Sequence, residues 1–137
     1  MLLLLLIFII LIFIAYKVSG GRAQKPGFLY LGEDWFKAAA AGDKTVDLRP
    51  GGKDKYKELV GKNFTYYHGN DEIKVNCVKI IHYNTLEDVF KKESLKLIAP
   101  HFKTEKEIKD SLSKYYTDSK IKDAGGINII HFKLVKK

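Results

Sequence analysis

The chain opens with fifteen residues, MLLLLLIFIILIFIA, none of which carries a charged side chain. A helix that is apolar on every face cannot be an amphipathic core helix, so we expect this segment to lie in lipid. Sixteen residues through Tyr16 would span about 24 Å, against about 30 Å for a bilayer core, and snorkelling by Lys17 helps to close that gap. We therefore predict a transmembrane anchor over residues 1–18, with a cleaved signal peptide as the alternative.

Basic residues after the apolar run predict its orientation. Lys17, Arg22 and Lys25 follow the run, and no acidic residue occurs before Glu33. Because positive charge beside a span is retained in the cytoplasm, we expect a single-pass membrane protein with its N-terminus outside and its C-terminal domain cytoplasmic. Residues 19–27, SGGRAQKPG, are predicted to be a short linker, and residues 28–137 a single domain.

The charge and cysteine content of this domain limit which partners and cofactors we expect. The chain carries 24 Lys and Arg against 16 Asp and Glu; without the three basic residues before position 28, the domain keeps 21 and a net charge of about +5. A polyanion is therefore a plausible partner, although lysines that only solvate the surface explain the charge equally well. Cys77 is the only cysteine and the four histidines form no close cluster in sequence, so we expect neither a metal ion nor a cofactor.

Local patterns predict an α+β fold. We expect strands at 28–31, 45–48, 63–67, 73–81 and 127–135. We expect helices at 34–41, capped by Asp34, at 86–93, capped by Thr85, and at about 104–118, capped by Thr104. This order predicts a small, mostly antiparallel barrel of about five or more strands, or a curled sheet, with helices covering its ends.

The strand at 73–81 carries a second, finer prediction. Regular alternation would place Ile73, Val75, Cys77 and Lys79 on one face, with Cys77 pointing into the core beside Val75.

The segment GDKTVDLR, residues 42–49, contains the only arginine of the domain. On a regular strand Asp47 and Arg49 share one face, and a twist at the preceding turn would bring Lys44 to the same cleft. The planar donor fork of arginine suits a phosphate or a base edge, which lysine cannot imitate. We predict Lys44, Asp47, Arg49 and Lys53 as ligand-binding residues; the alternatives are a structural Asp47–Arg49 pair and a solvated lysine loop.

These residues fit the pattern G-x-K-x-x-[E/D]-x-R, which is similar to the signature of ASCH domains, a branch of the PUA-like superfamily. Further landmarks occur in the same order: a helix before the glycine, the LVGKNF turn, a helical insertion that ends at Pro100, the pair Tyr115–Tyr116 and a closing strand. The resemblance covers roughly residues 28 to 137 and implies a PUA-like β-barrel.

The resemblance also implies chemistry. Family members are associated with RNA, and some are enzymes, including an amidohydrolase acting on N4-acetylcytidine and reported nucleases. In the amidohydrolase branch the motif lysine acts with a threonine three residues later and a glutamate of the helical insertion. Lys44 matches that lysine, but Asp47 occupies the threonine position. Glu93, or less well Glu87, matches the glutamate, so Lys44 and Glu93 are the candidate catalytic residues, with a solvated helix residue as the alternative for Glu93.

Three functions remain open at this level. The first is a membrane-anchored module that binds RNA or a nucleotide-like ligand through the motif cleft, and the second is a nucleoside or nucleic-acid hydrolase. The third is a membrane-tethered protein-interaction domain. For the first, a stacking surface could come from aromatic residues that otherwise fill the core: Trp35, Tyr66, Tyr67 and Tyr83.

Overall fold

The structure is a computed structural model that describes residues 27–136. The predicted anchor, residues 1–18, lies outside the described residues, as does the predicted linker apart from Gly27. Within the described range no helix has both the length and the hydropathy needed to cross a membrane.

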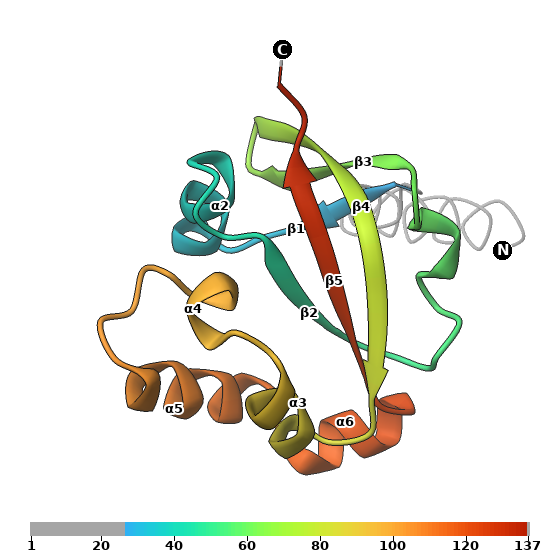
Figure 1. Cartoon of the computed structure of the whole chain (residues 1–137), viewed down its shortest axis with the longest axis vertical. Helices are drawn as coiled ribbons and strands as arrows, with labels where there is room; N and C mark the ends of the chain where they lie inside the picture. Colours follow the sequence, from blue (N-terminus) through green and yellow to red (C-terminus); the bar gives the residue numbers. More distant parts are fainter. Residues whose placement is uncertain (1–26, 137) are drawn as a thin grey trace, which may run out of the picture.

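A single curled sheet forms the centre of the described region. Its strands are β1 (Phe28–Tyr30), β2 (Val46–Pro50), β3 (Asn63–His68), β4 (Asp71–Tyr83) and β5 (Ile127–Leu134), in the order β1-β3-β4-β5-β2 (Figure 1). Only the β1–β3 pair is parallel. The α+β class is confirmed, and the sheet is a five-stranded half-barrel, which leaves β1 and β2 as its two edges.

Helices connect the strands and cover the sheet. They are α2 (Glu33–Ala40), η1 (a 3₁₀ turn, Lys57–Leu59), α3 (Leu86–Lys92), α4 (Leu95–Ile98), α5 (Glu105–Tyr115) and α6 (Asp118–Ala124). Figure 1 shows α2 beside the start of β2, while α3, α5 and α6 gather at the opposite end of the long strands. The β4–β5 connection therefore supplies most of the helical layer.

Helix starts follow the predicted caps at two of three places. The hydroxyl groups of Thr85 and Thr104 each accept a hydrogen bond from the backbone N–H three residues later, that of Asp88 and that of Glu107, each at 3.2 Å. The prediction that Asp34 caps the first helix was wrong, because α2 begins one residue earlier and Asp34 lies in its first turn. There a carboxylate still interacts favourably with the helix dipole.

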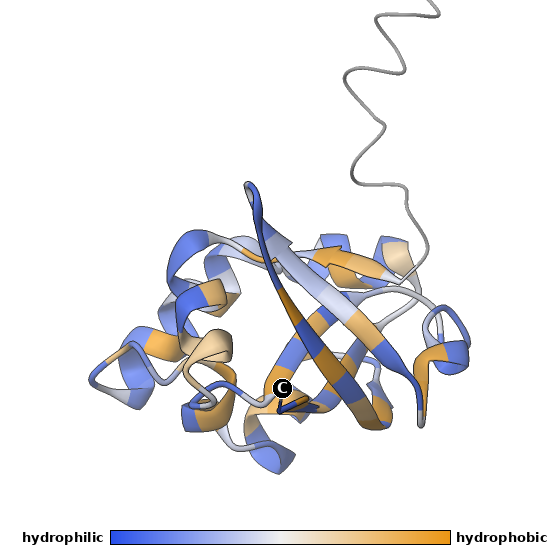
Figure 2. Ribbon diagram, turned by 90° about the horizontal axis from the view of Figure 1, so that it is seen from above, coloured by the Kyte–Doolittle hydropathy of each residue, from blue (hydrophilic) through white to orange (hydrophobic). Residues whose placement is uncertain are grey.

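Two apolar clusters pack on the two faces of the sheet. One contains Val46, Leu48 and Ile129 together with helices α3 to α6, and the other contains Phe64, Val75, Ile130 and the first helix. Figure 2 shows hydrophobic segments along the strands that cross the molecule, whereas the tip of the β3–β4 hairpin is hydrophilic. Because β2 contributes to the first cluster through alternate residues, Asp47 and Arg49 face the inner side of the curl.

The regular alternation predicted for β4 fails after Cys77. A β-bulge lies between Cys77 and Lys79, so that Cys77 pairs with Phe132 and Lys79 with the next residue back, His131. The extra residue, Val78, is exposed. Lys79 therefore lies on the opposite face from Cys77, because one inserted residue reverses the alternation. Cys77 itself is fully buried beside Val75, as predicted.

Candidate functional site

The motif residues lie where α2 turns into the edge strand β2. Gly42 takes a positive φ of 83° just after α2, which lets the chain reverse without a Cβ clash. Two main-chain hydrogen bonds fix the residues that follow Gly42: Lys44 N donates to Ala38 O at 3.1 Å, and Thr45 N donates to Leu97 O at 3.1 Å. This turn places Lys44 shortly before the first residue of β2 and fixes the position of its backbone.

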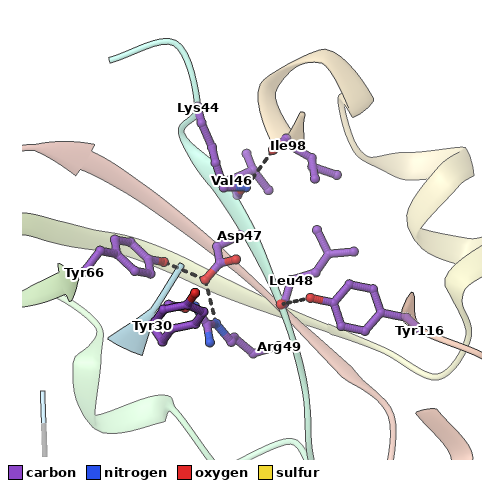
Figure 3. Close-up of polar contacts among 9 residues, drawn as sticks. All are labelled: Tyr30, Lys44, Val46, Asp47, Leu48, Arg49, Tyr66, Ile98 and Tyr116. Carbon is purple, nitrogen blue, oxygen red and sulfur yellow. Dashed lines mark hydrogen bonds and ion pairs between the residues drawn. The ribbon is translucent and has the colours of Figure 1, made fainter. Parts of the chain in front are cut away.

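Asp47 is the centre of a buried polar network (Figure 3). Its Oδ2 accepts hydrogen bonds from Arg49 Nε and from the Tyr66 hydroxyl, both at 2.8 Å. Burial alone would raise the pKa of Asp47, but the charges of Arg49 and Lys44 and these hydrogen bonds hold it below its ordinary value. The carboxyl group is therefore ionised at neutral pH and acts only as an acceptor.

Arg49 joins the two edges of the half-barrel. Its Nη2 donates to Tyr30 O of β1 at 2.6 Å, while its Nε holds Asp47 on β2. We call the open side between β1 and β2 the seam. A side chain, rather than a strand ladder, thus bridges the seam, and the structural interpretation of the Asp47–Arg49 pair agrees with this geometry.

Lys44 is buried although it carries an amine. Its side chain is 1% exposed, and Nζ donates to Val46 O and, at 2.6 Å, to Ile98 O of α4. Nζ also lies 5.1 Å from the centre of the Trp35 ring, within reach of a cation–π interaction. Burial lowers the pKa of Lys44 to about 8, against the opposing effect of Asp47.

A cavity of about 370 Å³ opens along the seam beside these groups. We call it the seam pocket; its lining residues come from β1 and its exit, α2, β2, α4 and α5: Tyr30, Leu31, Gly32, Trp35, Lys44, Asp47, Leu48, Arg49, Ile98, Leu112, Tyr115 and Tyr116. Three of the four predicted ligand-binding residues, Lys44, Asp47 and Arg49, thus share one pocket. This volume lies at the lower end of the range for small-molecule sites.

Tyr115 and Tyr116 are pocket residues that the sequence did not predict as such. Tyr115 is 64% exposed at the end of α5, whereas the hydroxyl of Tyr116 donates to Leu48 O of β2 at 3.3 Å. Burial, together with the negative charge of Asp47, raises the pKa of Tyr116 to about 12. Helical spacing in α5 predicts both residues on its apolar side, so the available signal indicated packing rather than a site.

The other aromatic candidates have different surroundings. Trp35 lines the seam pocket, as a stacking residue would. Tyr66 is fully buried against Asp47, and Tyr83 belongs to the cluster under the helices. Tyr67 contacts the Tyr30 ring edge-on, with 5.7 Å between ring centres, and so lies behind one wall of the pocket.

Glu93 lies apart from the seam pocket. Its side chain is only 6% exposed, and its Oε1 contacts His131 Nε2 at 2.6 Å. His131 pairs with Val46 across the β2–β5 ladder and so faces the helical side of the sheet. Glu93 is therefore not a solvated helix residue, and it is not among the residues that line the pocket with Lys44.

Lys53 lies in the exposed loop that follows β2 and is likewise not a lining residue. The start of that loop is anchored by Asn128, whose Nδ2 donates to Gly52 O at 2.9 Å. Among residues 27–136, no group of three or more His, Cys, Asp or Glu side chains is arranged to hold a metal ion.

Comparisons with known proteins identify the fold. No protein-family model matches the sequence, and no curated protein matches it. The structure is similar to the crystal structure of the hypothetical protein PH0355, with a TM-score of 0.62 and 20% identity over 79% of this chain and 97% of that one. It is also similar to the solution NMR structure of protein PF0455 from Pyrococcus furiosus, with a TM-score of 0.58 and 21% identity over 80% of this chain and 97% of that one.

At this identity the two structures indicate a shared fold and nothing about activity. A curled half-barrel with helices is compatible with the PUA-like superfamily.

Proposed function

We propose that the chain is an ASCH-type module whose seam pocket binds one base of an RNA or a similar nucleotide-like ligand. The observation that carries the proposal is the convergence of the motif side chains Lys44, Asp47 and Arg49 with an aromatic side chain, Trp35, on one cavity of about 370 Å³. The family signature over residues 42–49 and the half-barrel fold support the same interpretation.

The chemistry of the lining suits a flat, polar ring. Trp35 and the exposed Tyr115 place aromatic rings at the pocket lining, and stacking on an aromatic ring contributes about 1–3 kcal/mol per base. Arg49 offers a fixed fork of donors at the same wall. A net charge of +8 over the chain favours a polyanion that carries such a ring.

Trp35 makes the proposal directly measurable, because it is the only tryptophan of the chain and lines the pocket. The full chain in dodecyl maltoside micelles would be titrated with a short single-stranded RNA while Trp35 fluorescence is recorded at two salt concentrations. We expect saturable quenching whose midpoint moves to higher RNA concentration with salt. Arg49→Lys should weaken binding by about tenfold, because the ammonium group cannot reproduce the planar fork.

The matched control is Lys91→Gln, which removes one positive charge from an exposed position of α3 outside the pocket lining. It should change the midpoint by less than about twofold, since one distant exposed charge is largely screened. If RNA leaves Trp35 fluorescence unchanged at low salt while the protein stays folded, the proposal fails. The membrane-tethered interaction domain then becomes the better hypothesis.

The environment of Lys44 favours a second candidate, a nucleoside or nucleic-acid hydrolase. A lysine whose pKa is lowered to about 8 by burial carries an appreciable neutral fraction near pH 7 and can serve as a general base. Turnover of acetylated nucleosides or RNA that disappears in Lys44→Met would support hydrolysis. Binding without turnover supports the module instead. Glu93→Gln tests the remaining catalytic candidate, which would need to move from His131 to take part.

Membrane attachment through residues 1–18, with the N-terminus outside and the domain cytoplasmic, belongs to the same proposal. Asn63-Phe64-Thr65 is a glycosylation acceptor sequence, and Asn63 is exposed at the start of β3. Synthesis in the presence of microsomes should leave this asparagine unmodified. Glycosylation at Asn63 would place the domain on the opposite side of the membrane.

A further inference from the structure

The hydrogen bonds of the seam leave specific polar atoms of Asp47 and Arg49 unused. Both bonds to the carboxylate end on Oδ2, and within residues 27–136 no hydrogen bond to Oδ1 is found. Every fully buried side-chain nitrogen or oxygen in that range has a partner, so Oδ1 must have access to free space. Since Asp47 is 5% exposed and lines the seam pocket, that space is the pocket.

Arg49 has spare capacity of the opposite kind. Of the five N–H donors of a guanidinium group, the bonds to Asp47 Oδ2 and Tyr30 O engage one on Nε and one on Nη2. The side chain is 20% exposed and also lines the pocket. Three donors thus remain, on a side chain that lines the same pocket as Asp47, two residues along β2.

The roles of these two groups do not depend on pH near neutrality. The pKa of Asp47 is held below its ordinary value, and the pKa of Arg49 is raised by Asp47 although burial opposes this. A carboxylate can only accept and a guanidinium can only donate. A ring placed between them must therefore present a donor toward Asp47 and an adjacent acceptor toward Arg49.

We propose that the seam pocket selects bases with a lactam edge, in which a ring N–H stands beside a carbonyl, as in uracil or guanine: the N–H donates to Asp47 Oδ1 and the carbonyl accepts from Arg49. The inference rests on the proposed function, since it specifies which base that pocket takes. Cytosine and adenine also present a donor beside an acceptor, an exocyclic amine next to a ring nitrogen, so the selection depends on the strength of the two bonds. A lactam N–H is more acidic than such an amine and bonds more strongly to a carboxylate, and the oxygen suits the guanidinium fork.

The decisive comparison alters the ligand rather than the protein, because Asp47 and Arg49 also hold the seam. The full chain in dodecyl maltoside micelles would be titrated with single nucleosides, and Trp35 fluorescence would report occupancy. Uridine is compared with 3-methyluridine, whose methyl group replaces the N–H, and with 5-methyluridine, whose methyl group leaves the edge intact. Guanosine, cytidine and adenosine complete the set, with a short single-stranded RNA as the reference ligand.

We expect 3-methyluridine to bind at least about tenfold more weakly than uridine, because it removes a hydrogen bond to a charged, buried acceptor. 5-Methyluridine should bind within about threefold of uridine, and guanosine and uridine should both bind more tightly than cytidine and adenosine. Equal binding of uridine and 3-methyluridine, or tighter binding of cytidine or adenosine, overturns the selection of a lactam edge while the RNA-binding proposal stands. If neither nucleosides nor the RNA quench Trp35, the proposed function fails and this inference fails with it.

Discussion

Substitution of Lys44 by methionine gives the sharpest test of how the site is built, because this charged residue is only 1% exposed. Its pKa is lowered from 10.5 in the unfolded chain to about 8 in the folded one, mainly by burial. Well below pH 8 both states hold the proton, and the cost of burying the charge is fully present. Between pH 8 and 10.5 the unfolded state binds more protons than the folded state, so the stability of the wild type rises with pH.

The size of this effect follows from the two pKa values. Between about pH 7.5 and 9.5 the free energy of unfolding of the wild type should rise by about 2 kcal/mol through Lys44 alone. Lys44→Met removes the titrating group and therefore this rise. Its absolute stability is a separate matter, since the variant also leaves Val46 O and Ile98 O without their donor.

Other buried groups also titrate at alkaline pH, so the pH dependence of the free energy of unfolding must be compared between the wild type and Lys44→Met. The pKa values of Cys77, Tyr66 and Tyr116 are raised by burial, which lowers stability at high pH in wild type and variant alike. Urea unfolding followed by Trp35 fluorescence at several pH values yields the difference between the two proteins. Lys91→Met, at an exposed position of α3, should keep the pH dependence of the wild type.

A difference between wild type and Lys44→Met that stays constant from pH 7.5 to 9.5 would refute the reasoning. It would mean that Lys44 keeps an ordinary pKa, and that water or a rearrangement reaches Nζ in the folded protein. The general-base role considered for this residue would then lose its physical basis.

Three further predictions concern the seam and the sheet. Arg49→Lys should lower the free energy of unfolding by about 1–3 kcal/mol in urea titrations, because lysine cannot bridge both strand edges. Tyr116→Phe should cost about 0.5–1.5 kcal/mol through the lost bond to Leu48 O, and should remove one phenol that ionises near pH 12 in ultraviolet titration. Gly126→Ala should cost about 2 kcal/mol or more in thermal unfolding, because φ is +115° and the new Cβ would lie 2.5 Å from His82.

Local features of the fold could be predicted from the sequence, since they depend on neighbours in the chain. Thr85 and Thr104 cap their helices through residues three positions onward, which a sequence pattern contains in full. The four-residue helix α4 is too short to establish a period. The predicted helix at about 104–118 ended where α6 begins, so α6, which Thr117 caps separately, was not predicted. The bulge at Val78 depends on the register against β5, which no local pattern encodes.

For the candidate site, residue types were predictable but their partners were not. The motif predicted that Lys44, Asp47 and Arg49 would meet at one cleft, and they do line one pocket. The groups that orient them are Tyr66 OH, Tyr30 O and Ile98 O, which lie 19 to 54 residues away. Two of these are main-chain carbonyls. Every residue type has a main-chain carbonyl, so the sequence does not show which residue supplies such a partner.

The open seam accounts for both interpretations of Arg49. If β1 and β2 were joined by a ladder, their main-chain groups would pair and the cavity between them would not exist. Because β1 and β2 do not pair, side chains form hydrogen bonds to the main-chain carbonyls of these edge strands. Arg49 donates to Tyr30 O of β1, and Lys44 and Tyr116 donate to carbonyls of β2. The groups that stabilise the opening are thus the groups that line it. A ligand that bonds to the unused atoms of Asp47 and Arg49 would complete the same network, so binding at the seam should also stabilise the fold.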